Sequence, residues 1–591
     1  MKRFLAAILG FALLTSPAAA ASYSYEVPDS QTAQVGQSII TIWELTEGNW
    51  DSRREGRVFS PGQYGYETAN TYLCPNEKIL AGEYPCNFAE SGADLYGSNI
   101  LPVCKSDVDN FCVESMTFSL SDRVVVGQYF DDAGGDSFEA IPELGLEPGG
   151  LVSLWKVPGA ANSAGVETYA VSVRSRQNFN PYLKRIQTIS LDLSVTPYLE
   201  VQGNFYAPSS REGKDVNGLN KVYGGVPQGC TWSDEGRCGK AADFVGTPSV
   251  KLTIRASNEL TGWFRGRISG PELSISKFSE KSNRISISGQ PVEVPRFHVY
   301  ADASNTPIEV QQVFPRGSGG TGRELFEGNS SKQVFATGGE RTYQVLEGMR
   351  AAVKDTAAGT STLWSIESIP LGNQPCFAKA DGVLGVVSTN ATAYDGTAPG
   401  FENGQLTYKV AGLHYAPDGK TLNRGTYDLV MRSDIARCLY GFSSAPISAK
   451  IQVLTDRGES VVASTVVSER NGWLNLAAYG FTFSEKNIRV ELTQTKPPKL
   501  KRTLAKFAGN VSGLGKAQLQ EVSDLASKVT YQTRATCTAT YQINAAKSAA
   551  LARAKNVCSR LTSLSPNLSS KLVLQRTTSA ASSNKVSIVI D

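Results

Sequence analysis

The sequence predicts a mainly β protein of several domains, in which disulfide-stapled, β-sandwich-like domains are followed by a small α+β domain. Three observations support this prediction. Short runs of β-branched and aromatic residues, separated by Gly, Asn, Asp and Pro clusters, fill most of the chain. Ten cysteines fall into neighbouring pairs. Near the end of the chain, apolar residues change from the alternation typical of strands to the spacing typical of helices.

The first 20 residues have the composition of a secretory signal peptide. Lys2 and Arg3 precede an apolar run at 4–14, and small residues ending in alanines follow. The apolar run is too short to span a bilayer, which argues against the alternative of an N-terminal anchor helix. We therefore expect cleavage near residue 20, secretion to the cell surface or cell wall, and no transmembrane segment in the mature chain.

Composition places the rest of the chain among folded globular proteins. Hydrophobic residues make up 41% and charged residues 19%, which is too apolar and too weakly charged for a disordered chain. After cleavage roughly 570 residues remain, enough for about four domains of about 150 residues each.

The even number of cysteines predicts disulfides, because exported proteins fold in an oxidising compartment. A zinc site is the competing interpretation. No C-x-x-C spacing occurs, and His298 and His414 are the two histidines of the chain, so the usual zinc ligands are too few. Nearest-neighbour pairing is the simplest arrangement, and it predicts five disulfides: Cys74–Cys86, Cys104–Cys112, Cys230–Cys238, Cys376–Cys438 and Cys537–Cys558.

Residues 22–145 and 146–360 are expected to form two β domains. Runs such as RVVVGQYF, TISLDLSV and SVKLTIRAS have the composition of strands, and several alternate apolar and polar residues. The turn sequence LEPGG at 146–150 marks the boundary between them. Two cysteine pairs would staple loops of the first domain, and one pair would staple a loop of the second.

Residues 361–497 are expected to form a third β unit, a sandwich of five or six antiparallel strands. QLTYKVAGLHY, GTYDLVMRS and NIRVELTQ are typical strand sequences. The pair Cys376–Cys438 would cross-link this unit, as a disulfide does in many secreted sandwiches. Paired prolines and charges before and within 498–502 indicate a short, stiff linker.

Residues 503–591 are expected to form the α+β domain. Apolar residues at helical spacing between 519 and 529 indicate a first helix. A strand leading to Cys537 follows, and Asn544 is expected to cap a second helix. KLVLQ and KVSIVI have the composition of two final strands. The expected buried stripe of the second helix consists of Leu551, Ala554, Cys558 and Leu561.

Three stretches of this domain carry a family resemblance: LGKAQLQEVSDLASKV in the first helix, LARAKNVCSRL in the second and NKVSIVI in the last strand. They resemble the OmpA-like C-terminal domain, a peptidoglycan-associating βαβαβ module, over about residues 503–591. The cysteine-bearing form is similar to degenerate copies of this domain in secreted proteins of Gram-positive bacteria. The upstream β region resembles large uncharacterised secreted and surface proteins of such bacteria, a likeness that names no activity.

The resemblance implies a clamp in which an Asp and an Arg hold the charged ends of a diaminopimelate side chain. Arg553 matches the Arg of the family motif, whereas Thr538 occupies the place of the Asp. The partner for the ligand's ammonium group is therefore missing, although a lone Arg can still bind a carboxylate. We name Arg553 and Lys585 as candidate ligand-binding residues for peptidoglycan or another anionic polymer.

The charge distribution also favours an anionic partner. Residues 499–591 carry 14 Lys and Arg and 3 Asp and Glu, a net charge of +11, whereas the whole chain is +3. Teichoic polymers, cell-wall carboxylates and lipid headgroups would attract such a segment. Nucleic acid is not an expected partner, because the basic residues are not interleaved with a row of aromatic residues. A solubilising charged face is the alternative interpretation.

No motif predicts catalysis, a cofactor or a metal centre. GSGGTG at 317–322 lacks the preceding strand and the following helix that a dinucleotide site requires. There is no G-x-S-x-G, and neither histidine lies in a triad context. Acidic runs at 106–110 and 131–136 could ligate calcium without completing an EF-hand loop. The candidates for sugar stacking, for most of which core packing is the competing interpretation, are Trp43, Trp50, Tyr64, Tyr66 and Trp263.

These observations together predict a secreted, non-catalytic cell-surface or cell-wall-associated protein that displays β modules. Its basic OmpA-like tail is expected to interact with the anionic envelope. Cell-wall polymers and other surface proteins are the expected partners, without a cofactor. The alternative is a secreted carbohydrate-binding protein or glycan-active hydrolase, with its site in the N-terminal β region.

Overall fold

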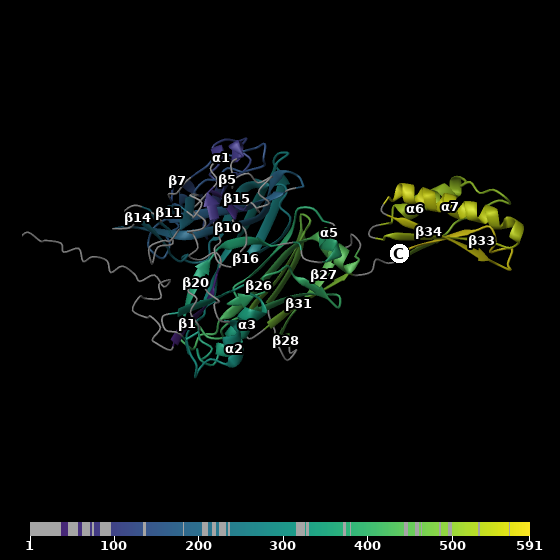
Figure 1. Ribbon diagram of the computed structural model, residues 1–591. Coiled ribbons are helices and arrows are strands. Elements are labelled where there is room, and N and C mark those ends of the chain that lie inside the picture. The colour runs from purple at the N-terminus through teal and green to yellow at the C-terminus, as the bar shows by residue number, and fades with distance from the viewer. Residues whose placement is uncertain are drawn as a thin grey trace, which may run out of the picture. The chain divides into compact units, whose positions relative to one another are not determined.

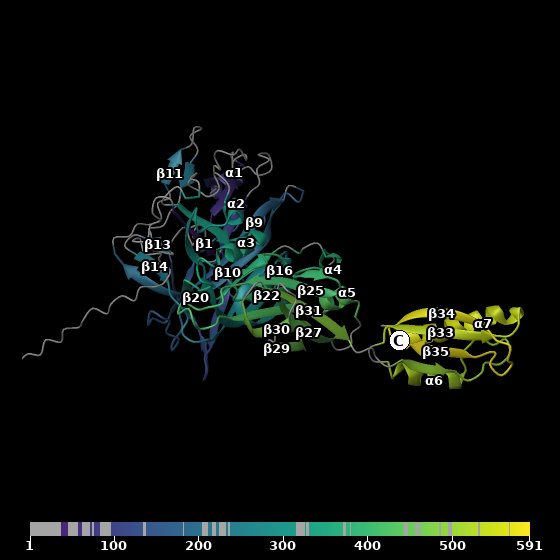
Figure 2. The same cartoon turned by 90° about the horizontal axis from the view of Figure 1, so that it is seen from below.

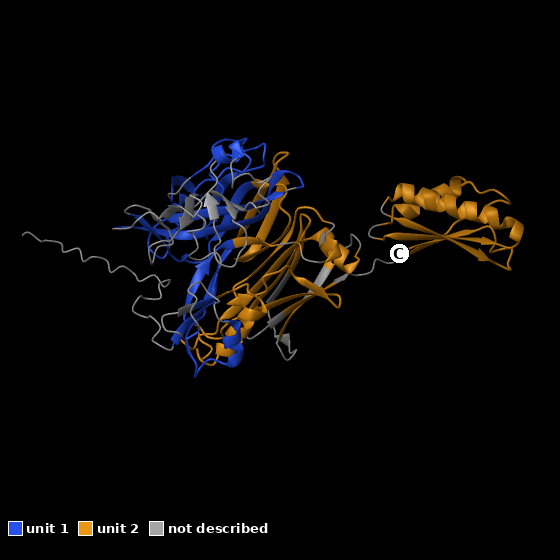
Figure 3. Ribbon diagram, viewed as in Figure 1, with its two compact units in different colours: residues 1–255, 290–333, 357–365 blue, residues 256–289, 334–356, 366–591 orange. Residues whose placement is uncertain are grey.

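The computed structural model shows a mainly β chain with several sheets (Figure 1). The residues that it describes are 37–44, 57–61, 71–73, 76–82, 96–133, 137–180, 182–203, 211–214, 220–223, 232–234, 237–314, 325–326, 330–369, 371, 374–378, 380–442, 447–455, 460–461, 464–483, 486–494, 499–529, 532–566 and 568–591. The expected signal peptide at 1–20 and the loop at 317–322 lie outside these residues. The chain divides into two compact units (Figure 3): unit 1 comprises 1–255, 290–333 and 357–365, and unit 2 comprises 256–289, 334–356 and 366–591.

The described residues of unit 1 form mainly strands. Its elements are β1 (Gln37–Trp43), β2 (Arg57–Pro61), β3 (Thr71–Leu73), α1 (Asn76–Ala81), β4 (Tyr96–Ile100), β5 (Cys112–Ser119), β6 (Val124–Val126), β7 (Gln128–Asp132), β8 (Ser153–Lys156), β9 (Thr168–Asn180), β10 (Arg185–Gln202), β11 (Arg211–Lys214), β12 (Asn220–Tyr223), β13 (Trp232–Asp234), β14 (Arg237–Ala241), β18 (His298–Asp302), α2 (Ile308–Val313) and β20 (Gly359–Leu363). Four strands contain residues of both units: β15 (Ser249–Ser257), β17 (Ser282–Arg296), β19 (Ser330–Phe335) and β21 (Ser365–Ile369).

The long antiparallel pair of β9 and β10 is the centre of unit 1. β4 and β8 both pair with β9, and β5 pairs with β15. β4 and β5 precede the boundary expected at 145/146, whereas β9 and β15 follow it. Hydrogen bonds between strands therefore join residues 22–145 to residues 146–360, and the turn at 146–150 does not separate two independent sheets.

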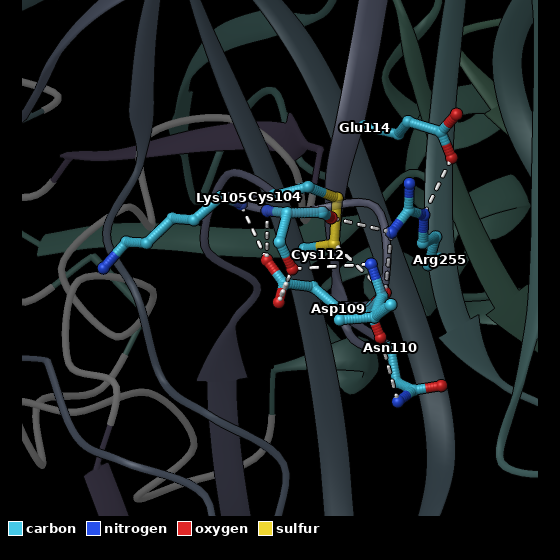
Figure 4. Close-up of a disulfide and its surroundings, with 9 residues drawn as sticks. Cys104, Lys105, Asp109, Asn110, Cys112, Glu114 and Arg255 are labelled. Carbon is cyan, nitrogen blue, oxygen red and sulfur yellow. Dashed lines mark hydrogen bonds and ion pairs between the residues drawn. A yellow bond between two sulfur atoms is a disulfide. The ribbon is translucent and has the colours of Figure 1, made fainter.

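The disulfide Cys104–Cys112 staples the loop before β5, as expected (Figure 4). Within this loop, the carboxylate of Asp109 accepts hydrogen bonds from the backbone N–H of Ser106 at 2.9 Å and from its hydroxyl at 2.7 Å. The hydroxyl hydrogen bond lowers the pKa of Asp109. Arg255 Nη1 donates to the carbonyl oxygens of Ser106 and Asp109, at 3.1 and 2.9 Å. The acidic run at 106–110 thus forms a loop in which the Asp109 carboxylate accepts hydrogen bonds from the loop itself and Arg255 binds the loop carbonyls.

Unit 2 contains two sheets and a separate C-terminal module. Its elements before residue 499 are β16 (Gly262–Lys277), α3 (Glu340–Met349), α4 (Pro375–Ala378), β22 (Val383–Thr389), β23 (Ala393–Tyr394), β24 (Gly400–Glu402), β25 (Gln405–Ala411), β26 (Arg424–Arg432), α5 (Ser433–Tyr440), β27 (Ile447–Thr455), β28 (Ser460–Val461), β29 (Ser464–Arg470), β30 (Trp473–Thr482) and β31 (Lys486–Gln494). One sheet runs β16-β22-β26-β30-β29, and the other runs β23-β25-β31-β27-β28.

Two features of unit 2 bear on the expected domain at 361–497. The parallel pair of β16 and β22 crosses the boundary expected at 360/361, so strands from both sides share one sheet. The disulfide Cys376–Cys438 joins α4 to α5, which confirms that predicted pair. Cys238 is also disulfide-bonded, while its expected partner Cys230 and the expected pair Cys74–Cys86 lie outside the described residues.

The C-terminal module, residues 499–591, has the α+β organisation that the sequence predicts. Its elements are β32 (Leu500–Thr503), α6 (Lys516–Ala526), β33 (Arg534–Tyr541), the 3₁₀ turn η2 (Asn544–Ala546), α7 (Lys547–Leu564), β34 (Ser569–Arg576) and β35 (Val586–Ile590). The sheet order is β32-β35-β33-β34, with β33 and β34 parallel and the other pairs antiparallel. The linker expected at 498–502 needs correction, because its residues from Leu500 onward form the edge strand β32.

Both helices of the module lie on one side of its sheet (Figure 1). The disulfide Cys537–Cys558 fastens β33 to α7 and confirms a third predicted pair. Two details of the expected helix are corrected. Leu551 is 45% exposed, and Ala550 and Val557 are buried on α7 instead. Asn544 lies in η2 and makes no side-chain cap.

Candidate functional site: the basic surface of the C-terminal module

The positive charge of the C-terminal module is barely compensated within the module itself. Its three acidic residues are all engaged. Glu521 pairs with Arg502 at 2.9 Å, and Asp591 pairs with Lys499 at 3.2 Å. Asp524 accepts a hydrogen bond from Gln520. Most of the 14 basic side chains of residues 499–591 therefore have no acidic neighbour among the described residues of the module.

Almost all of these basic side chains face solvent. Arg553 is buried and Lys585 is half-buried, and the other twelve are exposed. They occupy both the helices and the sheet. Lys547, Lys555 and Arg560 lie on α7, whereas Lys501, Arg534, Lys571 and Arg576 lie on strands.

The strands alternate between a core face and a face without helices. In β33 the residues Ala535, Cys537 and Ala539 are buried against α6 and α7, so Thr536 and Thr538 point to the opposite side. We call that side the open sheet face. Figure 2 turns the chain so that the strands of the module are seen from below.

Strand register arranges the open sheet face into rows. One row runs from Lys501 through Val589 and Thr536 to Lys571, one residue from each strand. Four neighbouring strands span about 14 Å, so a positive charge stands at each end of a row about that long. Arg534 occupies the same face of β33, two residues before Thr536.

Hydroxyl groups and valine side chains lie between these charges. The next row contains Thr503, Ser587 and Thr538, and Thr503 Oγ1 and Ser587 Oγ lie 3.2 Å apart. Within the described part of the chain, the hydroxyls of Thr536 and Thr538 make no hydrogen bond. The position at which Thr538 replaces the family Asp thus presents a neutral hydroxyl on a flat, basic face.

Arg553 lies in the interior of the module, at 1% exposure. Its Nε donates to the carbonyl of Val511 and its Nη1 to Asn584 Oδ1, both at 2.7 Å, and Nη2 donates to the carbonyl of Gly509. The guanidinium also lies over the Phe507 ring, 5.3 Å from its centroid. Burial lowers the pKa of Arg553. The side chain ties α7 to the segment before α6, instead of reaching into solvent.

Lys585 lies just before β35, on the same side as the open sheet face. Its backbone makes two hydrogen bonds with Thr540. Thr540 N–H donates to the Lys585 carbonyl at 2.9 Å, and Lys585 N–H donates to the Thr540 hydroxyl oxygen at 3.2 Å. Its half-buried ammonium group has no partner among the described residues. Of the two predicted site residues, Lys585 is the one on the surface.

The structure describes only some of the other sequence candidates. Trp263 is fully buried and packs edge-on against Phe377, with ring centroids 5.4 Å apart. Trp43 is half-buried, while Trp50, Tyr64 and Tyr66 lie outside the described residues. His414 Nδ1 lies 2.6 Å from Asp355 Oδ2.

The described ranges lack two kinds of feature, a cluster of metal ligands and a membrane-spanning helix. These ranges hold no cluster of three or more His, Cys, Asp or Glu that could bind a metal ion. None of the helices described in the chain combines the length and apolarity that crossing a bilayer requires.

Sequence reasoning found the basic segment but not the residues that form its surface. Lys501 and Lys571 belong to no motif. The excess of Lys and Arg over residues 499–591 is the sequence feature that points to a binding role for them. Their common face depends on the register of strands that are distant in the sequence. No family model, curated protein or solved structure matches the chain.

Proposed function

We propose that this chain is a secreted, non-catalytic cell-surface or cell-wall-associated protein, with an OmpA-like C-terminal module that binds an anionic envelope polymer. The single observation that carries the proposal is the net charge of +11 on residues 499–591, whose three acidic side chains are already engaged. The module runs strand, helix, strand, helix, strand, strand, so its first five elements follow the βαβαβ order that the resemblance implies. The three disulfides in the described residues support an oxidising compartment.

The geometry favours binding by distributed charge over a diaminopimelate clamp. Arg553 is enclosed by protein acceptors, and Thr538 supplies no carboxylate for an ammonium group. The open sheet face instead offers Lys501, Arg534 and Lys571 beside the hydroxyls of Thr536 and Thr538. A linear polymer with regularly spaced phosphates can meet several of these cations at once, and hydroxyl donors can bond its phosphate oxygens.

Such binding must weaken steeply with salt. The screening length falls from about 10 Å at 0.1 M salt to about 3 Å at 1 M, so exposed charges attract a polyanion only at low ionic strength. Binding by a buried clamp that recognises one side chain through short hydrogen bonds would depend far less on the salt concentration.

The test is sedimentation of the intact secreted chain with purified cell walls over a salt series. The variant Lys501→Glu/Arg534→Glu/Lys571→Glu reverses the open sheet face. Its matched control, Lys547→Glu/Lys555→Glu/Arg560→Glu, makes the same charge change on α7. We expect salt-sensitive binding that the sheet variant abolishes and the helix variant only weakens. Walls stripped of phosphate polymers should retain little protein.

Three results would contradict this proposal. Absence of binding at every salt concentration would leave the module without an envelope partner. Equal losses in both triple variants would show that the open sheet face has no special role. Salt-resistant binding to stripped walls would indicate recognition of peptidoglycan itself.

A further inference from the structure

A cavity of about 330 Å³ lies wholly within unit 2. All the residues that line it precede the C-terminal module in the sequence. Its volume is at the lower end of the range for small-molecule sites in proteins. Buried apolar side chains contribute to its lining: Leu260, Ile285 and Val383 are 3%, 1% and 6% exposed. Ile275 and two glycines also line the cavity, and the remaining lining residues are polar or aromatic.

An ion pair with fixed geometry lines one side of this cavity. Arg432 Nε donates to Asp434 Oδ1 at 3.0 Å and Arg432 Nη2 to Asp434 Oδ2 at 2.6 Å, while Nη1 donates to the Asp381 carbonyl at 2.6 Å. Burial opposes ionisation of Asp434, but the hydrogen bonds and charge of Arg432 outweigh it and lower the pKa of Asp434. The pair is therefore ionised and carries no net charge, so the cavity favours an uncharged ligand.

The carboxylate of Asp434 can still accept further hydrogen bonds. Each of its oxygens accepts one hydrogen bond from Arg432, and the backbone N–H groups of Ile435 and Asp434 also stabilise the carboxylate, which has about four acceptor sites and is largely open to solvent. The side chain is 61% exposed, so a ligand can reach the remaining sites. The amides of Asn283 and Asn471 add both donors and acceptors to the same lining.

A tight turn positions an aromatic side chain beside this ion pair. Asn471 and Gly472 connect β29 to β30 and have positive φ values of 51° and 79°, as in the two-residue turns preferred by hairpins. Ser433 N–H donates to the Gly472 carbonyl at 2.8 Å, which fastens the turn to α5. Trp473 follows directly and is the cross-strand partner of Arg432. The half-buried indole is thus held in place before any ligand arrives.

We propose that this cavity binds one sugar unit of an uncharged glycan. A pyranose ring has an apolar face that packs on an indole, and its edge carries hydroxyls that donate to a carboxylate and bond to amides. An anion would meet the carboxylate of Asp434. A quaternary cation would need a cage of several aromatic rings, and Trp473 is the single aromatic residue in this lining. This proposal is independent of wall binding by the module.

The test titrates the full-length chain with glucose, galactose, mannose and N-acetylglucosamine, using saturation-transfer NMR and calorimetry. We expect saturable binding of at least one of them. Trp473→Ala and Asp434→Asn should each weaken that binding about tenfold, which corresponds to about 1.4 kcal/mol, because the first removes the stacking surface and the second weakens the hydrogen bonds to the sugar hydroxyls. Trp473→Phe should retain most of the affinity.

The matched control is Glu469→Gln. Glu469 is also paired with an arginine, Arg437, at 2.8 Å, but it does not line the cavity. We expect this variant to bind sugar as the unmodified chain does. The proposal is overturned if none of the four sugars binds saturably, or if binding survives both Trp473→Ala and Asp434→Asn in chains whose thermal melting is unchanged.

Discussion

At the scale of single residues, Arg553 shows how a residue expected to bind a ligand can instead stabilise the fold. Its guanidinium donates to the carbonyls of Gly509 and Val511 and to Asn584 in a buried setting. Arg553→Ala would remove these donors and leave buried acceptors unsatisfied. We expect the module to lose about 3 kcal/mol of stability. Hydrogen exchange of peptides from β33 and α7 in the full-length chain measures this loss.

The control for that prediction is Arg560→Ala, on the exposed side of the same helix. Surface substitutions of this kind usually change stability by less than about 0.5 kcal/mol. If Arg553→Ala left exchange unchanged but abolished wall binding, Arg553 would be a ligand-binding residue after all, as the resemblance implies.

Asp428 is a second residue whose environment predicts a measurable effect. It is 3% exposed in β26, and its Oδ1 accepts hydrogen bonds from the Tyr479 hydroxyl at 2.5 Å and Gly270 N–H at 3.3 Å. Its Oδ2 is buried and has no partner among the described residues. Burial, only partly offset by these hydrogen bonds, raises the pKa of Asp428 to about 7.

This raised pKa predicts that stability falls as pH rises. The folded chain holds the Asp428 proton more tightly than the unfolded chain. The contribution of this proton to the free energy of unfolding is therefore complete below about pH 4 and is lost as the pH rises to about 7. A difference of about three units between the pKa values of the folded and unfolded states corresponds to a change on the order of 4 kcal/mol in the free energy of unfolding. Urea midpoints of the wild type between pH 4 and 8 should show this slope, and Asp428→Asn should flatten it. An identical slope in the wild type and in Asp428→Asn would show that other groups cause the pH dependence.

At the scale of elements, the disulfide Cys537–Cys558 joins a central strand to the helix that covers it. The two residues are 21 apart in the sequence, and closing a loop of that length stabilises a fold by roughly 3 kcal/mol on the chain-entropy model. We expect Cys537→Ala/Cys558→Ala to increase hydrogen exchange in β33 and α7. Cys376→Ala/Cys438→Ala should act on α4 and α5 instead, and leave the C-terminal module protected. Equal effects of both variants on the module would contradict this assignment.

Element positions follow the sequence pattern closely where the pattern is strong. GTYDLVMRS became β26, and KVSIVI became β35 with Val586, Ile588 and Ile590 buried in alternation. The weaker signals failed. β32 overlaps the linker expected at 498–502, because Lys501 and Arg502 are charged and the segment becomes a strand only by pairing with β35. Leu551 fell outside the buried stripe, because Ala550 and Val557 set the phase of α7.

At the scale of the whole molecule, charge is divided unevenly along the chain. Residues 499–591 carry +11 in a chain of +3, so the preceding residues together carry −8. The proposed wall-binding surface lies in the basic part, and the proposed sugar site lies in strands and turns that come before it. Two modes of contact with a glycan-rich envelope, one electrostatic and one neutral, would then coexist in a single chain and could be removed separately.

The sequence alone determined what is local. Turn clusters and alternation placed most strands. Three nearest-neighbour disulfides formed as expected over sequence separations of 8, 62 and 21 residues, and the cost of closing a loop grows only slowly with its length. Tertiary structure decided which strands meet. It paired β5 with β15, set β16 beside β22, and placed Trp473 opposite Arg432. A strand's own residues record which face is apolar but not its partner, since pairing depends on contacts with segments far away in the chain. The burial of Arg553 has the same cause.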